Sequence, residues 1–223
     1  CFYYYTINPL PDNLALCCSI WGLAFFFSWL NKRSNYLLVL CSFLLCIGTL
    51  CKLPFVLYYI VPATYFIINI FQKKSPKENI LNGFKVASFI IFPLAWYVSV
   101  VPQWHGNGVV SGVFDNTVSW ATVLDYMQHN LISTLPELLV NYGSMLFFLA
   151  GFYFLVKNKV FKNPLFPVFI AWSAAILFYF FFELNMIAKI HDYYLFPFYP
   201  LIFILVSYGA YNMLSLNSKF ITY

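Results

Sequence analysis

Charged residues are scarce in this chain. Only 9% of its 223 residues are Asp, Glu, Lys or Arg, whereas 62% are hydrophobic. A soluble domain carries roughly a quarter charged residues, because its outside must face water. The composition therefore excludes an ordinary soluble domain and predicts that lipid surrounds most of the chain.

Sequence motifs for several kinds of chemistry are missing. The chain has no Gly-rich phosphate loop, no Ser nucleophile elbow and no nucleic-acid-binding motif. Its three histidines, His105, His129 and His191, lack the spacing of metal ligands. The cysteines lie inside apolar runs or near their ends, without a disulfide or zinc pattern. We therefore expect no metal, no cofactor and no nucleic-acid partner.

The chain begins at Cys1, and a few apolar residues lead at once into the loop-like sequence Asn8-Pro9-Leu10-Pro11-Asp12. The basic, apolar and small-residue regions of a signal peptide are not recognisable there. We interpret the chain as a fragment that lacks its natural N-terminus.

Long uncharged apolar runs follow one another along the sequence. A helix needs about 20 apolar residues to cross roughly 30 Å of hydrocarbon. Runs near this length occur at residues 13–30, 36–51, 53–71, 84–101, 141–157, 165–182 and 194–213. The pattern predicts an all-α, polytopic integral membrane protein of about seven transmembrane helices, with residues 1–223 as a single transmembrane domain.

Basic and acidic residues fall in alternate connections between these runs. One set of connections holds most of the basic residues: Lys32, Arg33, Lys73, Lys74, Lys77, Lys85, Lys157, Lys159, Lys162 and Lys219. The other set holds all three histidines and every acid except Glu78, namely Asp12, Asp115, Asp125, Glu137, Glu183 and Asp192. The positive-inside rule places the basic set in the cytoplasm. The acidic face is therefore predicted to be extracytoplasmic and to carry the chemistry.

The connection at residues 102–140 is a long extracytoplasmic loop with a helical pattern of its own. One face of a helix is formed by Trp120, Leu124, Met127 and Leu131, and Asp125, Gln128 and His129 point elsewhere. We expect residues 118–131 to form an amphipathic helix that lies in the membrane interface. Pro136 indicates a break before the next span.

Lys52 is the most unusual basic residue, because it lies between two apolar runs on the predicted outer side. A cation there needs an anionic partner. The alternative is a lysine that extends its amine to the lipid headgroups, and the residues alone leave both interpretations open. Asp12 follows Pro11 just before the first span, where an acid can cap a helix and oppose its positive end, and this is its simpler interpretation.

Lys189 is the second lysine on the outer side and opens the sequence Lys189-Ile190-His191-Asp192-Tyr193-Tyr194. Two lysines, a histidine and tyrosine hydroxyls near the membrane boundary could bind a phosphate or pyrophosphate through charge-assisted hydrogen bonds. An aromatic belt at the interface explains Tyr193 and Tyr194 equally well, but explains the two lysines less well. Asp115, Asp125, Glu137 and Glu183 could each supply a general base, and the sequence does not distinguish between them.

Three segments together resemble a known family. They are the sequence from Asn8 to Leu16, the junction Gly48-Thr49-Leu50-Cys51-Lys52-Leu53-Pro54, and the segment from Lys189 to Pro200. Their order and spacing are similar to the membrane half of the polyprenyl-phosphate-sugar-dependent glycosyltransferases of GT-C fold. That family includes the protein mannosyltransferases, the lipid A aminoarabinose transferases and their bacterial relatives.

The resemblance implies a function. In this family an acceptor, which is a lipid, a glycan or a protein, attacks the sugar of a polyprenyl-phosphate donor on the extracytoplasmic side of the bacterial inner membrane. By resemblance, Lys52, Lys189 and Tyr193 fall at donor-phosphate-binding positions, with His191 and Asp12 as supporting residues. The family's catalytic aspartate lies in the first extracytoplasmic loop, and no residue here matches it. We expect that aspartate upstream of this fragment, which alone would be inactive.

Two other classes of protein fit the same composition. A transporter or flippase of polyprenyl-linked glycans would also bind a lipid phosphate, but it would bury charges midway along its helices and contain broken helices. A structural membrane subunit would leave Lys52 and Lys189 pointing separately to lipid headgroups. Charges at the ends of the predicted spans favour the enzyme.

Overall fold

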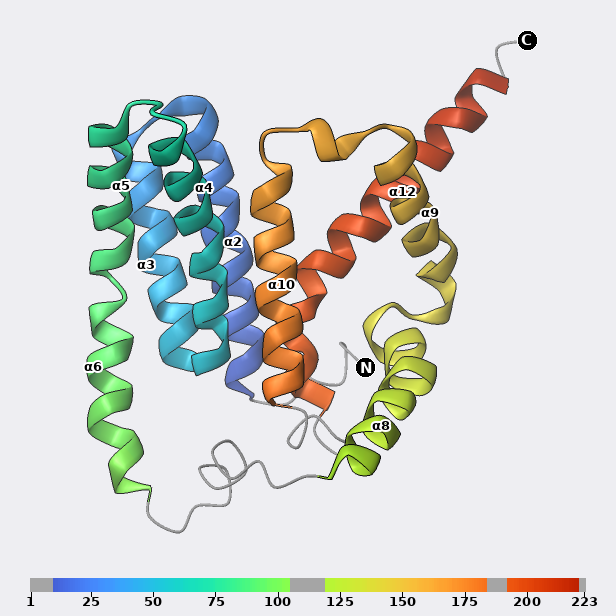
Figure 1. Cartoon of the computed structure of the whole chain (residues 1–223), viewed down its shortest axis with the longest axis horizontal. Coiled ribbons are helices and arrows are strands. Elements are labelled where there is room, and N and C mark those ends of the chain that lie inside the picture. Colours follow the sequence, from blue (N-terminus) through green and yellow to red (C-terminus); the bar gives the residue numbers. More distant parts are fainter. Residues whose placement is uncertain (1–9, 105–118, 184–191, 221–223) are drawn as a thin grey trace. The chain divides into compact units, whose positions relative to one another are not determined.

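The computed structural model describes residues 10–104, 119–183 and 192–220, and these residues are helical with short connections (Figure 1). They belong to two compact units. The N-terminal unit comprises residues 3–116 together with Pro167–Phe182, and the C-terminal unit comprises residues 117–166 and 183–223 with the first two residues. The predicted all-α class is confirmed for the described residues.

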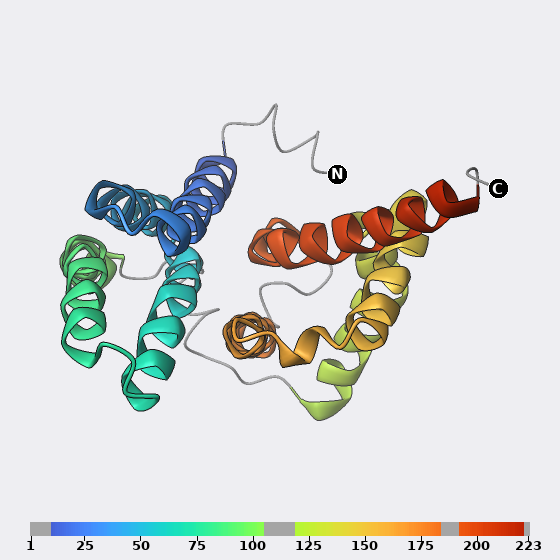
Figure 2. The same cartoon turned by 90° about the horizontal axis from the view of Figure 1, so that it is seen from above.

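The described residues of the N-terminal unit form eight helical segments. They are α2 (Pro11–Lys32), α3 (Asn35–Cys51), the 3-10 helix η1 (Leu53–Tyr59), α4 (Ile60–Phe71), α5 (Pro76–Ser88), α6 (Ile91–Val100), the 3-10 turn η2 (Val101–Gln103) and α10 (Phe166–Phe182). Helix α3 is the centre of this unit, because it contacts α2, η1, α5 and α6 (Figures 1 and 2).

Small residues allow α2 and α3 to approach closely. A Cβ atom on Gly48 of α3 would lie 2.8 Å from the Ser19 hydroxyl and 3.1 Å from the Ala15 carbonyl oxygen of α2. Such small-residue contacts are typical of helices packed in lipid, where backbone approach and dispersion replace the hydrophobic effect. Near the other end of α2, Phe26 and Trp29 pack against Phe66 of α4, with ring centroids 6.1 and 5.5 Å away.

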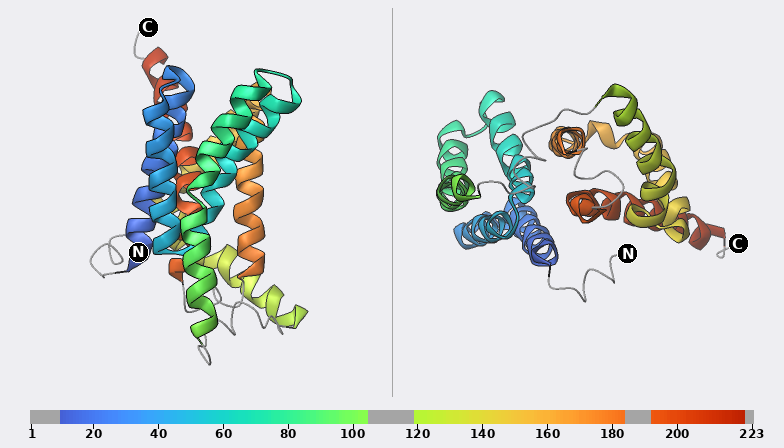
Figure 3. Two further views of the ribbon diagram at one scale, coloured as in Figure 1. Left: turned by 90° about the vertical axis from the view of Figure 1, so that its left-hand side faces the viewer. Right: turned by 90° about the horizontal axis from the view of Figure 1, so that it is seen from below.

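In the described part of the N-terminal unit most basic residues lie at one end, whereas Asp12 and Lys52 lie at the other. The α2–α3 and α4–α5 turns, which carry Lys32, Arg33, Lys73 and Lys74, are at one end (Figures 1 and 3). The start of α2 and the junction between α3 and η1 are at the other. Lys85 was expected in a connection between spans but lies inside α5. Its amine donates to the Oδ1 atoms of Asn35 (2.9 Å) and Asn82 (3.3 Å).

The C-terminal unit is built on the pair α9 and α12. Its segments are α8 (Trp120–His129), the π-helix η3 (Asn130–Leu139), the 3-10 turn η4 (Tyr142–Ser144), α9 (Met145–Lys157), the 3-10 turn η5 (Val160–Lys162), the 3-10 helix η6 (Asp192–Phe198) and α12 (Tyr199–Phe220). Gly151 and Gly209, both buried, lie where the backbones of α9 and α12 meet. A Cβ atom on Gly209 would overlap the Phe147 carbonyl oxygen and lie 2.7 Å from the Gly151 nitrogen.

The helix expected within the long outer loop is present as α8, and the described chain continues helically through Pro136. The π-helix accommodates this proline, because a wider turn of i to i−5 hydrogen bonds, such as that from the Val140 nitrogen to the Leu135 oxygen, relieves the clash of the ring. The break before α9 is at Asn141, whose φ is 66°. Trp120 and Leu124 are 82% and 63% exposed, as an interfacial apolar face requires, and the orientation of α8 relative to a membrane stays a prediction.

Several helices are long and apolar enough to cross a membrane. Among the described residues these are Pro11–Lys32, Leu53–Phe71, Pro76–Gln103 and Tyr194–Ser215, with the pair Trp120–Glu137 and Tyr142–Lys157, bent by 78°, as a fifth. Helices α3 and α10, each of 17 residues, are apolar but shorter. Four to five spans are thus supported by length and composition. The seven predicted spans and the single transmembrane domain stay predictions.

The close contact between α9 and α12 makes a stability prediction. Gly209→Ala should destabilise the protein by about 1–3 kcal/mol, because the added methyl group meets backbone atoms that cannot move aside. Gly83→Ala in α5 is the matched control, since its Cβ would lie 3.7 Å from the nearest Phe66 atom and helical alanine is preferred to glycine. Melting temperatures in detergent should fall for the first variant only. Equal values would contradict the close approach.

Candidate functional site

Asp12 and Lys52 form a charged pair at one end of the N-terminal unit, the end that the charge pattern predicts to be extracytoplasmic. The Lys52 ammonium donates to Asp12 Oδ1, across 40 residues of sequence. Asp12 is 2% exposed and the Lys52 side chain 16% exposed, so both charges are largely withdrawn from solvent. The pair joins the first turn of α2 to the junction between α3 and η1.

Lys52 owes its position to Pro54. Proline has no N–H group and its ring clashes with the carbonyl four residues earlier, so an α-helix cannot run on through this position. The helix α3 ends at Cys51, and Lys52 is extended with φ of −156° and ψ of 123°. Its backbone nitrogen still donates to the Gly48 oxygen (3.1 Å), and its carbonyl oxygen accepts from Phe55 (3.1 Å). The break turns the lysine side chain toward the start of α2.

Tyr97 of α6 completes this junction. Its hydroxyl lies 3.1 Å from the Thr49 carbonyl oxygen and 3.3 Å from the Leu50 carbonyl oxygen. Helix α3 ends with carbonyl groups that have no partner in the next turn, and an unpaired carbonyl is costly in apolar surroundings. Sequence reasoning missed Tyr97, because it is one of 18 tyrosines and nothing in its local pattern distinguishes it.

Asp12 lies within the first turn of α2, after Pro11 at the helix start. The N-cap residue is Leu10, without a side-chain capping hydrogen bond, so Asp12 does not act as a cap. Its negative charge opposes the positive end of the helix dipole, which is the second part of the expected structural role. The anionic partner expected for Lys52 is thus found within the chain.

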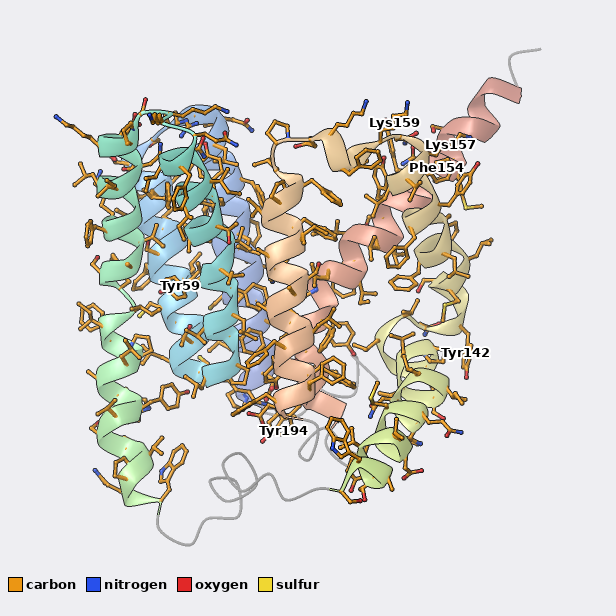
Figure 4. All side chains as sticks on the ribbon, viewed as in Figure 1. Tyr59, Tyr142, Phe154, Lys157, Lys159 and Tyr194 are labelled. Atoms are coloured by element: carbon orange, nitrogen blue, oxygen red, sulfur yellow. The ribbon has the colours of Figure 1, made fainter. Side chains whose placement is uncertain are left out.

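The other predicted site residues belong to the C-terminal unit. Lys189 and His191 lie outside the described residues. The backbone of Tyr193 lies in η6. Its neighbour Tyr194 is buried, at 8% exposure, which does not fit an aromatic anchor facing the membrane interface (Figure 4). A shared site for Lys52, Lys189 and Tyr193 stays a prediction.

The candidate general bases differ in burial. Asp125 and Glu137 are exposed, whereas Glu183, the last residue described after α10, is 8% exposed. Asp115 lies outside the described residues. Among residues 10–104, 119–183 and 192–220, no group of three or more His, Cys, Asp or Glu side chains could hold a metal ion. Lys52, which is bonded to Asp12, is a basic side chain of the described residues at this end of the N-terminal unit.

Comparisons of the chain with protein-family models, with curated proteins and with solved structures found no match. Functional inference therefore rests on the residues themselves.

The charged pair makes a second stability prediction. Lys52→Met and Asp12→Asn should each cost about 3 kcal/mol, the lower end of the range for breaking a buried pair, because Lys52 keeps some exposure. The double variant Asp12→Asn/Lys52→Met should recover most of this loss, since no unpaired charge remains. Thermal unfolding in detergent of all four proteins measures the coupling. Additive losses would show that the two side chains do not interact.

Proposed function

We propose that this chain is the membrane domain of a glycosyltransferase that moves a sugar from a polyprenyl-phosphate donor to a lipid, glycan or protein acceptor. The reaction takes place on the extracytoplasmic face of the bacterial inner membrane. The supporting observation is that Asp12 and Lys52 form an ion pair. They belong to two of the three segments that carry the family resemblance, and those segments are far apart in the sequence.

The chemistry of the proposed reaction gives Lys52 its role. Transfer of the sugar leaves the negative charge on the departing lipid phosphate, and a fixed ammonium group stabilises that charge. Asp12 is a positioning residue: it bonds to the Lys52 ammonium and holds the side chain at the end of the helices. A lysine has three N–H donors, so bonding to a carboxylate is compatible with contact to a phosphate oxygen.

The remaining members of the proposed phosphate site are Lys189 and Tyr193, with His191 as a supporting residue. They supply further donors for the phosphate oxygens. Membrane lipids surround the domain, and the donor reaches the site from the bilayer.

A transfer assay tests this proposal. Membranes that contain the whole gene product are given a labelled polyprenyl-phosphate sugar and a panel of acceptors, and label in the product is measured at equal protein level. Lys52→Met should lower transfer by about 10–100-fold, the size expected for one charge-assisted hydrogen bond. Lys32→Met, at the opposite end of the same unit and exposed, is the matched control and should leave transfer unchanged.

The double variant separates catalysis from folding. Asp12→Asn/Lys52→Met should fold well yet remain as inactive as Lys52→Met, because the phosphate has lost its cation. Transfer restored in the double variant would mean that the pair is structural only. Absence of transfer by the unmodified protein, over the whole panel of donors and acceptors, would favour the transporter of polyprenyl-linked glycans.

A further inference from the structure

A groove runs between α4 and α5 in the N-terminal unit. Its volume is about 380 Å³, within the range of roughly 300–1,000 Å³ that is usual for ligand pockets. The residues that line it are Tyr59, Ala63, Phe66, Ile67 and Ile70 together with Asn79, Ile80, Gly83, Phe84, Val86, Ala87 and Ile90. Each group follows the spacing of one helical face, so each helix supplies one wall of the groove. Helices α4 and α5 lie side by side (Figure 3).

The walls of the groove are apolar, because its two most polar residues make hydrogen bonds to the backbone. The Tyr59 hydroxyl donates to the Ser42 carbonyl oxygen of α3 (3.2 Å; Tyr59 is labelled in Figure 4). The Asn79 amide nitrogen donates to the carbonyl oxygens of Lys74 (2.6 Å) and Ser75 (3.1 Å). The rim is open, since Ile67 is 51% exposed and Phe84 70% exposed. The groove suits a hydrocarbon chain.

A basic turn lies at the end of this groove. Lys73, Lys74 and Lys77 are exposed and lie in or next to the α4–α5 turn, with Glu78 as the acid of the same stretch. Lys77, Ile80 and Phe84 are spaced by three and four residues, so the lysine continues the apolar wall along one face of α5. Hydrogen bonds from Asn79 hold the backbone of this turn at Lys74 and Ser75.

From this combination we infer that the α4–α5 groove binds one anionic phospholipid from the leaflet that the lysines face. An acyl chain fills the groove and the phosphate contacts Lys73, Lys74 and Lys77. Charge sorting along the sequence predicts this leaflet to be the cytoplasmic one, which carries the anionic surface. The site is independent of the proposed transfer reaction, which concerns the opposite end of the unit.

Charge complementarity favours a lipid over a second copy of the chain. Two copies in one membrane share the same orientation, so a dimer through this groove would place two basic turns next to each other. Like charges repel, and this contact would have no compensating acid beyond Glu78 among the described residues of the turn. An anionic headgroup instead is attracted by the three lysines and reduces the repulsion between them.

Lipid retention measured by native mass spectrometry tests the inference. The whole protein is taken from bilayers that contain equal amounts of phosphatidylglycerol and phosphatidylcholine, and the lipids that stay bound are identified. One phosphatidylglycerol should be retained. The triple variant Lys73→Gln/Lys74→Gln/Lys77→Gln should bind it about 100-fold more weakly, from the attraction expected per lysine.

The matched control removes the same number of exposed lysines elsewhere. The variant Lys157→Gln/Lys159→Gln/Lys162→Gln changes the basic turn after α9 in the C-terminal unit, where Lys157 and Lys159 are labelled in Figure 4. It should retain the lipid as the unmodified protein does. An equal loss in this control would mean a general attraction to anionic surfaces and would overturn the specific site.

Filling the groove gives the second arm of the experiment. Gly83→Leu should abolish retention, because its side chain grows from the groove wall, with 3.7 Å between the new Cβ and Phe66. Ala63→Phe, at an exposed position on the opposite wall, gives the same test if Gly83→Leu does not fold. Retention by both filled variants overturns the inference. Loss of an oligomer rather than of a lipid would assign the groove to a second copy.

Discussion

Hydrocarbon offers no hydrogen-bond partner to a backbone N–H or C=O group, so a helix that enters it must satisfy its own backbone groups. Four to five of them are long and apolar enough for such surroundings. Within a helix the backbone groups bond to one another, so unpaired N–H and C=O groups occur where a helix is broken, and burying them costs free energy. At Pro54 the Tyr97 hydroxyl from α6 provides the hydrogen bond that the end of α3 lacks. At Pro136 a wider π-helical turn keeps the chain hydrogen-bonded.

The same constraint explains how Asp12 and Lys52 can be charged where they lie. Removing an isolated charge from water costs several kcal/mol, and pairing with an opposite charge offsets this cost. The carboxylate at the start of α2 is also favoured by the helix dipole. Because the pair couples two helices at one end of the unit, it fixes the position of a cation there.

Helix packing follows from the lack of a hydrophobic drive between apolar helices in lipid. Where glycine removes the side chain, backbones come into contact, as Gly48 does against α2 and Gly209 against α9. Between α4 and α5 a groove remains, and its position beside a basic turn gives it a chemical character that the surrounding apolar surface does not have.

The sequence by itself determined the helical class, most helix bounds within a few residues and the separation of basic from acidic ends, because composition and charge act locally along the chain. For Lys52 it offered two alternatives, an anionic partner or contact with lipid headgroups. Only the tertiary structure decided that Asp12 is that anion, that Tyr97 completes the α3 junction and that α4 and α5 enclose a groove. The packing of the helices determines which residues 40 or more positions apart come into contact. The periodicity of one helix does not show which other helix packs against it.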